Sequence, residues 1–216
     1  MPNLLQLDSS ADLRTSRSRS ITATFANTWT ALGPDHTVTR RDLHRDPLPH
    51  LADADLHWPA RLRPAGASPP AEAERQQQGL IDELLAADVL LLGAPLYNYS
   101  VPSTLKAWID NIHVPGLTAP FGSADTQPLK GRPAVIVTSR GGAYDTGTPT
   151  EGWDHAVPAL QLILGSSLGM SVSVITTNLT LAETVPALAD QLDRSRNELA
   201  AAHREATELA EKLGAA

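Results

Sequence analysis

Residues 89–106 read VLLLGAPLYNYSVPSTLK, and this stretch combines the strongest local signals for the fold. Residues 89–93 are apolar without alternation, which is the pattern of a strand covered on both faces in a parallel sheet. The apolar run opens into Ala94–Tyr99, which contains two tyrosines and an asparagine. Pro102 then suits the first turn of a helix. The stretch therefore predicts a buried strand, an unusual aromatic loop and a helix in succession.

The same succession of strand and helix recurs along the chain. Strand patterns lie at residues 3–8, 36–43, 89–92, 134–138 and 171–176. Helical spacing of apolar residues predicts helices from about residue 18, over 72–86, from Pro102, over 156–168, and in a C-terminal segment lined by Leu188, Leu192, Leu199, Leu209 and Leu213. Strict alternation predicts an α/β fold with a parallel sheet and helices on both faces. Five strands fit the doubly wound, flavodoxin-like order 2-1-3-4-5. We expect one domain over residues 1–216.

Composition excludes several classes of protein. The net charge of −7 argues against a nucleic-acid partner, because binding to phosphates requires a basic face. The absence of cysteine excludes disulfides and thiolate metal sites, and the seven histidines show no metal-binding spacing, so we expect no metal. No apolar run approaches the roughly 18 residues of a membrane span, and the N-terminus lacks the pattern of a signal peptide. We therefore expect a cytoplasmic protein without a membrane partner.

The loop after the first strand, residues 8–20, has the composition of an anion site. Its sequence DSSADLRTSRSRS contains three arginines and leads into a helix N-terminus, where free N–H groups and the helix dipole favour an anion. Ser10, Ser16 and Ser18 add hydroxyl groups, and Arg17 adds charge. A solvated capping loop explains the same residues. The glycine patterns of ATP and dinucleotide loops are absent.

Two further loops are unusual, and the predicted topology brings all three to one edge of the sheet. Tyr97 and Tyr99 can flank a planar ring whose edge Asn98 recognises, or they can cap the core while Asn98 makes a turn. Gly141 and Gly142 can bring the backbone close to a ligand, or can form an ordinary turn. A phosphate end combined with a planar heterocycle describes FMN.

The motifs also resemble those of a known family. They are Ser9-Ser10, Ser16-x-Ser18, A-P-x-Y-N-[FY] at 94–99, T-L-K at 104–106 and T-S-R-G-G at 138–142. In this combination, order and spacing they resemble the FMN-dependent NADH-azoreductases, which are NAD(P)H:quinone oxidoreductases with a flavodoxin-like fold. The similarity extends over most of the chain.

The resemblance implies a cofactor, a reaction and a set of site residues. Residues assigned to the FMN phosphate are Ser10, Ser16, Arg17 and Ser18. Residues assigned to the two sides of the flavin ring are Leu96, Tyr97, Asn98 and Tyr99, and Ser139, Arg140, Gly141 and Gly142. NADH or NADPH would reduce FMN, and a quinone or azo compound would then accept two electrons in a ping-pong cycle. The chemistry belongs to FMN, so no catalytic side chain is assigned. The resemblance also implies a homodimer with its active site near the interface.

Two segments diverge from the family pattern and are expected on the substrate side. They are a proline-rich, lid-like excursion near 46–70 and a loop near 113–131. Trp58, Phe121 and Tyr144 are candidates for the wall of the acceptor pocket. An FMN electron carrier of the flavodoxin type, acting on protein partners, is the main alternative, and a flavodoxin-like protein without flavin is another. The G-x-S-x-G match at 165–169 lies between a helix and the following strand, the reverse of a hydrolase nucleophile elbow, and predicts a helix C-cap.

Overall fold

The computed structural model describes residues 1–122 and 127–215. Within them, the strands form one parallel sheet with the order β2-β1-β3-β4-β5, which confirms the predicted topology. The strands are β1 (Asn3–Asp8), β2 (Thr37–Asp42), β3 (Val89–Gly93), β4 (Pro133–Ser139) and β5 (Ser171–Thr177). In the register, Asp8 of β1 lies opposite both Asp42 of β2 and Gly93 of β3. The carboxyl ends of β1, β2 and β3 are therefore level.

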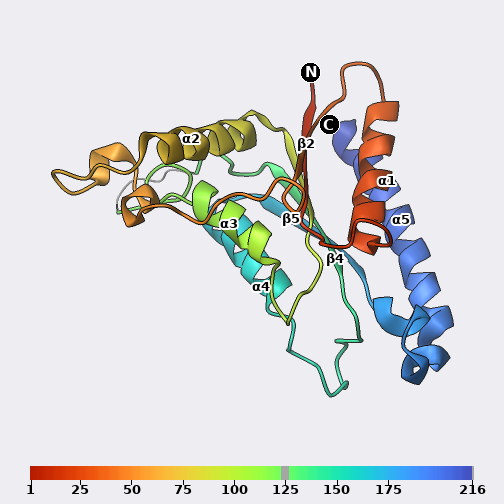
Figure 1. Cartoon of the computed structure of the whole chain (residues 1–216). Coiled ribbons are helices and arrows are strands. Elements are labelled where there is room, and N and C mark those ends of the chain that lie inside the picture. Colours follow the sequence, from red (N-terminus) through yellow and green to blue (C-terminus); the bar gives the residue numbers. More distant parts are fainter. Residues whose placement is uncertain (123–126, 216) are drawn as a thin grey trace.

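The sheet lies between two helical layers, as Figure 1 shows. One layer contains α1 (Arg17–Ala31) and α5 (Leu192–Gly214), and the other contains α2 (Ala71–Ala86), α3 (Ser103–Ile112) and α4 (Ala156–Leu160). The central strand β3 packs against both helical layers. Leu90 and Leu92 pack with the α2, α3 and α4 layer, while Val89 and Leu91 pack with α1 and α5. Burial on both faces explains why this strand shows no alternation.

The C-terminal helix packs differently from the expected leucine stripe. Ala202, Ala206 and Ala210 are buried against α1, and Leu199, Leu209 and Leu213 are only partly buried. Leu188 lies before α5, in a 3-10 helix (Pro186–Gln191). Residues four apart share a helical face, so the three alanines present a smooth surface on which α1 can lie close. Small residues, rather than leucines, therefore form the centre of this helix contact.

The helix expected over 156–168 is in two parts. It starts as α4 and continues as a π-helix (Gln161–Ser167). Gly169 then adopts a φ of +77°, and its N–H donates to the carbonyl oxygen of Gly165 at 3.0 Å. The G-x-S-x-G match therefore ends a helix before β5, as predicted.

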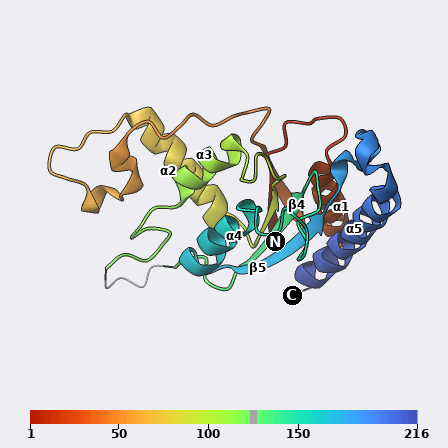
Figure 2. The same ribbon diagram turned by 90° about the horizontal axis from the view of Figure 1, so that it is seen from below.

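The proline-rich segment 46–70 extends beyond the sheet on the α2 side, where Figures 1 and 2 show it beside segment 113–122. It contains two short 3-10 helices (Ala54–His57 and Ala60–Leu62). Leu56 is fully buried, and its carbonyl oxygen accepts a hydrogen bond from Gln77 Nε2 at 2.8 Å. The excursion is thus attached to α2. Part of the expected substrate-side loop, residues 123–126, lies outside the described residues. No helix in the described part of the chain is long and apolar enough to cross a membrane.

Candidate active site

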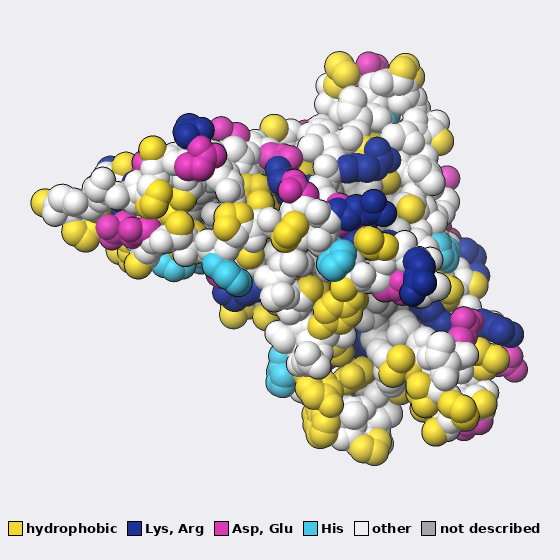
Figure 3. All heavy atoms as spheres, viewed as in Figure 1, with side chains coloured by type: hydrophobic (Ala, Val, Ile, Leu, Met, Phe, Trp, Pro, Cys, Tyr) yellow, Lys and Arg dark blue, Asp and Glu magenta, His cyan; other side chains and the backbone are white. Residues whose placement is uncertain are grey.

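A cleft of about 480 Å³ lies at the carboxyl edge of the sheet, where the winding reverses. Figure 3 shows this edge, at the bottom of the view, hollowed between two lobes. The lining residues come from four loops: Ser10, Asp12, Thr15, Ser16 and Arg17; Pro95, Leu96 and Tyr97; Ser139 and Gly141; and Thr180, Leu181, Glu183 and Thr184. The structure thus brings the three unusual loops of the sequence together and adds a fourth.

The start of α1 forms one end of the cleft. Ser16 is the N-cap residue, and its Oγ accepts from the N–H of Arg19 at 3.3 Å and lies 3.1 Å from Ser18 Oγ. Because the helix begins at Arg17, the N–H groups of its first residues have no acceptor within the helix. Hydroxyl groups and free N–H groups at a helix N-terminus are suited to a phosphate.

Two arginines of this loop bind oxygens of the protein itself. Arg19 makes a bidentate ion pair with Asp42 at 2.7 and 2.8 Å and also donates to the carbonyl oxygen of Ser10. Arg17 is buried, and its guanidinium donates to oxygens of Asn178 and Ser195. Both side chains therefore hold the protein's own backbone in place.

Asp12 stabilises the turn between Ser10 and Ser16. Its carboxylate accepts from the Thr15 hydroxyl and from the N–H groups of Thr15 and Arg14, at 2.5 to 2.9 Å. These hydrogen bonds, that of the Thr15 hydroxyl first, lower the pKa of Asp12 to about 2. The carboxylate is therefore ionised at neutral pH, and these hydrogen bonds hold its own loop together.

The second end of the cleft is a tight turn. The N–H and carbonyl groups of Tyr97 and Ser100 bond to each other at 2.9 and 3.0 Å, and the residues between them, Asn98 and Tyr99, have φ values of +48° and +66°. Two positive φ values are typical of a type I′ turn, and a tyrosine rarely adopts one. Asn98 thus makes a turn, and its amide lies at the tip. Strain of this kind is concentrated at functional sites.

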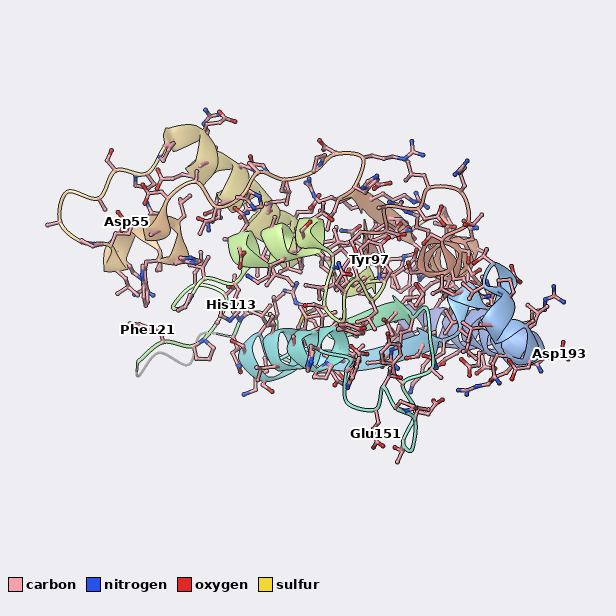
Figure 4. All side chains as sticks on the ribbon, turned by 60° about the horizontal axis from the view of Figure 1, so that its bottom comes forward. Asp55, Tyr97, His113, Phe121, Glu151 and Asp193 are labelled. Carbon is pink, nitrogen blue, oxygen red and sulfur yellow. The ribbon has the colours of Figure 1, made fainter. Side chains whose placement is uncertain are left out.

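Tyr97 connects this turn to the loop after β1. Its hydroxyl oxygen accepts from the N–H of Ala11 at 3.0 Å and lies 3.3 Å from Ser10 Oγ. Figure 4 shows Tyr97 over the middle of the sheet edge. The tyrosine therefore lies between the loop after β1 and the aromatic turn.

The loop after β4 forms the third wall. Arg140 makes an ion pair with Asp154, and both side chains are at most 16% exposed. The Arg140 guanidinium also lies 5.8 Å from the ring centre of Tyr144, and burial raises the pKa of that tyrosine. A methyl group added to Gly141 would lie 2.9 Å from Leu181 Cδ1. The absence of a side chain at Gly141 thus allows the third and fourth walls to pack closely.

Two parts of the site were missed from the sequence. The fourth wall, residues 180–184, follows β5, which lies beside β4, so its approach to the cleft was a consequence of the predicted strand order. Trp153 is 48% exposed and contacts the 45% exposed ring of Tyr99 edge to face, with 5.3 Å between ring centres. A tryptophan in a loop of small and polar residues was the available signal in the sequence.

Trp58 and Phe121 lie elsewhere. Their rings contact each other edge to face at 4.9 Å, and Trp58 lines a separate cavity of about 390 Å³ beside α2. Figure 4 shows Phe121 and Asp55 at one end of the molecule and Tyr97 nearer its middle. Within one chain, only Tyr144 of the three suggested wall residues is near the cleft. In the described part of the chain, no cluster of His, Cys, Asp and Glu residues is suited to a metal ion.

The fold and the cleft together define a doubly wound α/β protein with a serine-rich helix N-terminus and an aromatic turn at its topological switch point. The chain belongs to the family described as having a flavodoxin-like fold, which matches residues 2–206.

Curated relatives are similar over the whole chain. A protein of Kineococcus radiotolerans named FMN-dependent NADH:quinone oxidoreductase is 60% identical over 213 residues, covering 99% of this chain and 100% of the relative. A protein of Frankia casuarinae with the same name is 44% identical over 209 residues, with 94% and 98% covered. The solved structure of azoreductase from Bacillus anthracis str. Sterne superposes with a TM-score of 0.80 at 20% identity and covers 98% of this chain and 100% of that one. That structure supports the fold.

Proposed function

We propose that this protein is an FMN-dependent NAD(P)H:quinone oxidoreductase that also reduces azo compounds. The observation that carries the proposal is the cleft itself, because it joins a helix N-terminus rich in hydroxyl groups to a strained aromatic turn. Those two ends match the phosphate and the ring of FMN. The names of the relatives point to the same cofactor and to NADH as the electron donor.

The residues present are suited to FMN. Ser10, Ser16 and Ser18 would bind the phosphate, together with the first N–H groups of α1 and the charge of Arg17. Leu96, Tyr97, Asn98 and Tyr99 would line one side of the ring, and Ser139, Arg140, Gly141 and Gly142 the other. The hydroxyl groups of Ser16 and Ser18, which lie together at the N-terminus of α1, support this fit.

Bound FMN would supply the redox chemistry, taking a hydride from NAD(P)H and passing two electrons to the acceptor. The chain's own residues hold the ring and exclude water. The N–H groups of Gly141 and Gly142 would face negative charge on the ring, and the exposed rings of Tyr99 and Trp153 would form an apolar rim for a flat acceptor. Tyr144, predicted from the sequence as a wall residue of the acceptor pocket, remains a candidate for that role.

A homodimer is part of the proposal. An apolar groove of about 580 Å³ runs between α3 and the α4 region and shares Tyr97 and Asn98 with the site. Leu162 on the π-helix after α4 is 64% exposed. A second copy seated on this groove would bury these surfaces and place the active site near the interface. Trp58 and Phe121 of that second copy would then be able to contact the acceptor. A single domain over residues 1–216 and a cytoplasmic location remain predictions from the sequence.

The visible spectrum of the purified protein tests this function. Yellow protein that releases FMN, identified by mass, and bleaches on NADH addition under nitrogen would support it. Turnover of a small quinone with NADH would separate an enzyme from the electron carrier considered as the alternative. Colourless protein that ignores added FMN would overturn the proposal.

A further inference from the structure

Arg17 lies in the loop after β1, residues 8–20, and its guanidinium contacts the segment that forms the fourth wall of the cleft. Its side chain is buried, with 8% of the residue exposed. Nη1 donates to the carbonyl oxygens of Asn178 and Ser195 at 3.2 and 3.3 Å, and Nη2 donates to Ser195 Oγ at 2.8 Å. All of these acceptors belong to the segment after β5 or to the first turn of α5. The guanidinium therefore connects the start of α1 to the start of α5, where Figure 4 labels Asp193.

The fourth wall depends on the same contacts. Ser195 Oγ donates in turn to the carbonyl oxygen of Leu179 at 2.8 Å. Leu179 has a φ of +58°, a conformation that a leucine keeps only when its surroundings hold it. The chain then turns into residues 180–184 along the cleft, where the N–H of Thr180 donates to the carbonyl oxygen of Arg140 at 3.0 Å. The wall is thus fixed by the third loop on one side and by the Arg17–Ser195 contacts on the other.

The first two turns of α5 extend this connection. Glu198 accepts from the N–H of Asn178 at 2.9 Å and from Arg194 Nε at 2.7 Å, and Arg194 Nη2 donates to Asp145 in the loop after β4 at 2.5 Å. A continuous series of polar contacts therefore runs from the anion loop through α5 to the third wall. Of these contacts, those of Arg17 and Ser195 are buried, while those of Arg194 are exposed and screened by water.

We propose that Arg17 is a positioning residue, whose guanidinium fixes residues 178–184 against the start of α1 and so forms the anion end of the cleft before the cofactor binds. This inference rests on the proposed function, because FMN affinity is the property that the fixed wall would change. Three of the five N–H groups of the guanidinium are used on Asn178 and Ser195, so most of its donors bind the protein itself. A lysine could replace the charge, but it lacks the planar fork that reaches several acceptors at once.

Three variants separate position from charge. Arg17→Met removes both, Arg17→Lys keeps the charge, and Ser195→Ala removes the shared hydroxyl group. Ser195 is fully buried and does not line the cleft, so it can affect FMN only through the wall. Thr24→Ala is the matched control, because Thr24 Oγ1 contacts His203 Nδ1 at 2.7 Å and so also connects α1 to α5, away from the cleft.

Amide hydrogen exchange of the FMN-free protein measures the wall directly. We expect exchange of residues 178–184 to become about tenfold faster in all three variants, the loss expected for one hydrogen bond to a charged group, while β1 and α3 keep wild-type exchange. The FMN dissociation constant, measured by quenching of flavin fluorescence, should rise by about tenfold or more, and that of riboflavin, which lacks the phosphate, should rise less. Thr24→Ala should match the wild type in both measurements.

The opposite results would overturn the inference. They are wild-type exchange and FMN affinity in Arg17→Lys, which would assign the role to charge alone, or no effect of Ser195→Ala on either measurement. If the wild-type protein fails to bind FMN, the proposed function is wrong, and the exchange data still decide whether Arg17 fixes the wall. Uniformly faster exchange in every segment would mean loss of the fold, and would also count against a local role.

Discussion

The ion pair between Arg19 and Asp42 allows a stability prediction with a definite pH dependence. The two side chains are 18% and 25% exposed, and the guanidinium binds both carboxylate oxygens. Arg19 also donates to the carbonyl oxygen of Ser10 at 2.7 and 3.1 Å, so the pair attaches the anion loop to the end of β2. Asp42→Asn removes the charge and leaves one oxygen to accept from the N–H groups of His44 and Arg45.

The pKa of Asp42 determines the size of the effect. Burial alone would raise it, but hydrogen bonds from Arg19 and from the backbone N–H groups of Arg45 and His44 outweigh burial and lower the pKa from 3.8 to about 2. That difference, about 1.8 pH units, corresponds to about 2.4 kcal/mol at 1.36 kcal/mol per unit. Because a quarter of the side chain is exposed, solvent screening reduces the expected loss in Asp42→Asn to about 1–2 kcal/mol at pH 7.

The sign of the pH dependence follows from the lowered pKa. The ionised carboxylate stabilises the folded state above pH 3.8, and this contribution is lost as the pH falls towards 2. The difference in unfolding free energy between wild type and variant should therefore be constant near neutral pH and shrink below about pH 4. Asp12, whose pKa is also about 2, titrates in the same range but is present in both proteins and cancels.

Urea unfolding of the FMN-free proteins between pH 7 and pH 3 measures this difference. Asp110→Asn is the control, because it removes the more exposed ion pair with Lys106 on α3, and it should change stability by less than about 0.5 kcal/mol. The reasoning is refuted if Asp42→Asn unfolds within about 0.5 kcal/mol of the wild type at pH 7, or if its deficit persists unchanged to pH 3.

Three further predictions concern the ends of β1 and β3 and the aromatic turn. Gly93→Ala should lower the unfolding free energy by about 1–2 kcal/mol in urea, because the added methyl group would lie 2.6 Å from Asp8 Oδ1; wild-type stability would contradict this. Asp8→Asn should be at least as stable as the wild type at pH 7, because burial raises the pKa of Asp8 and its stabilising contribution is lost as the pH rises above 3.8. Gln6 can turn its unpartnered Oε1 to accept from the new amide, and a lower melting temperature at pH 7 would refute this prediction. Asn98→Gly keeps the positive φ but removes the amide, so it should weaken FMN binding several-fold in a fluorescence titration and leave the melting temperature within a few degrees; unchanged affinity would assign Asn98 to the turn alone.

Local patterns in the sequence predicted the architecture. Strands and helices alternate, and this alternation with crossovers of one hand permits few sheet orders, of which 2-1-3-4-5 is observed. The uniform apolar run of β3 identified the strand that is covered on both faces. Because ligand sites of such sheets lie where the winding reverses, three of the four cleft loops also followed from the chain order.

Composition alone could not predict the direction of individual side chains. The sequence predicted an anion site at the loop that contains Arg17 and Arg19, but it could not show that both bind oxygens of the protein itself that are distant along the chain. Trp58 and Phe121 are aromatic residues in divergent loops, yet they pack on each other away from the cleft of the same chain.

The sequence by itself determined the order of the elements, the sheet topology and the edge at which the site forms, because these depend on periodicity and on rules of chain connection. The tertiary structure alone decided that Arg17 connects the segment after β5 to α1 and that Trp153 meets Tyr99. These features depend on contacts between residues separated by 50 or more positions, such as Arg17 and Ser195 at a separation of 178. Such contacts form only when the whole sheet brings the loops to one edge.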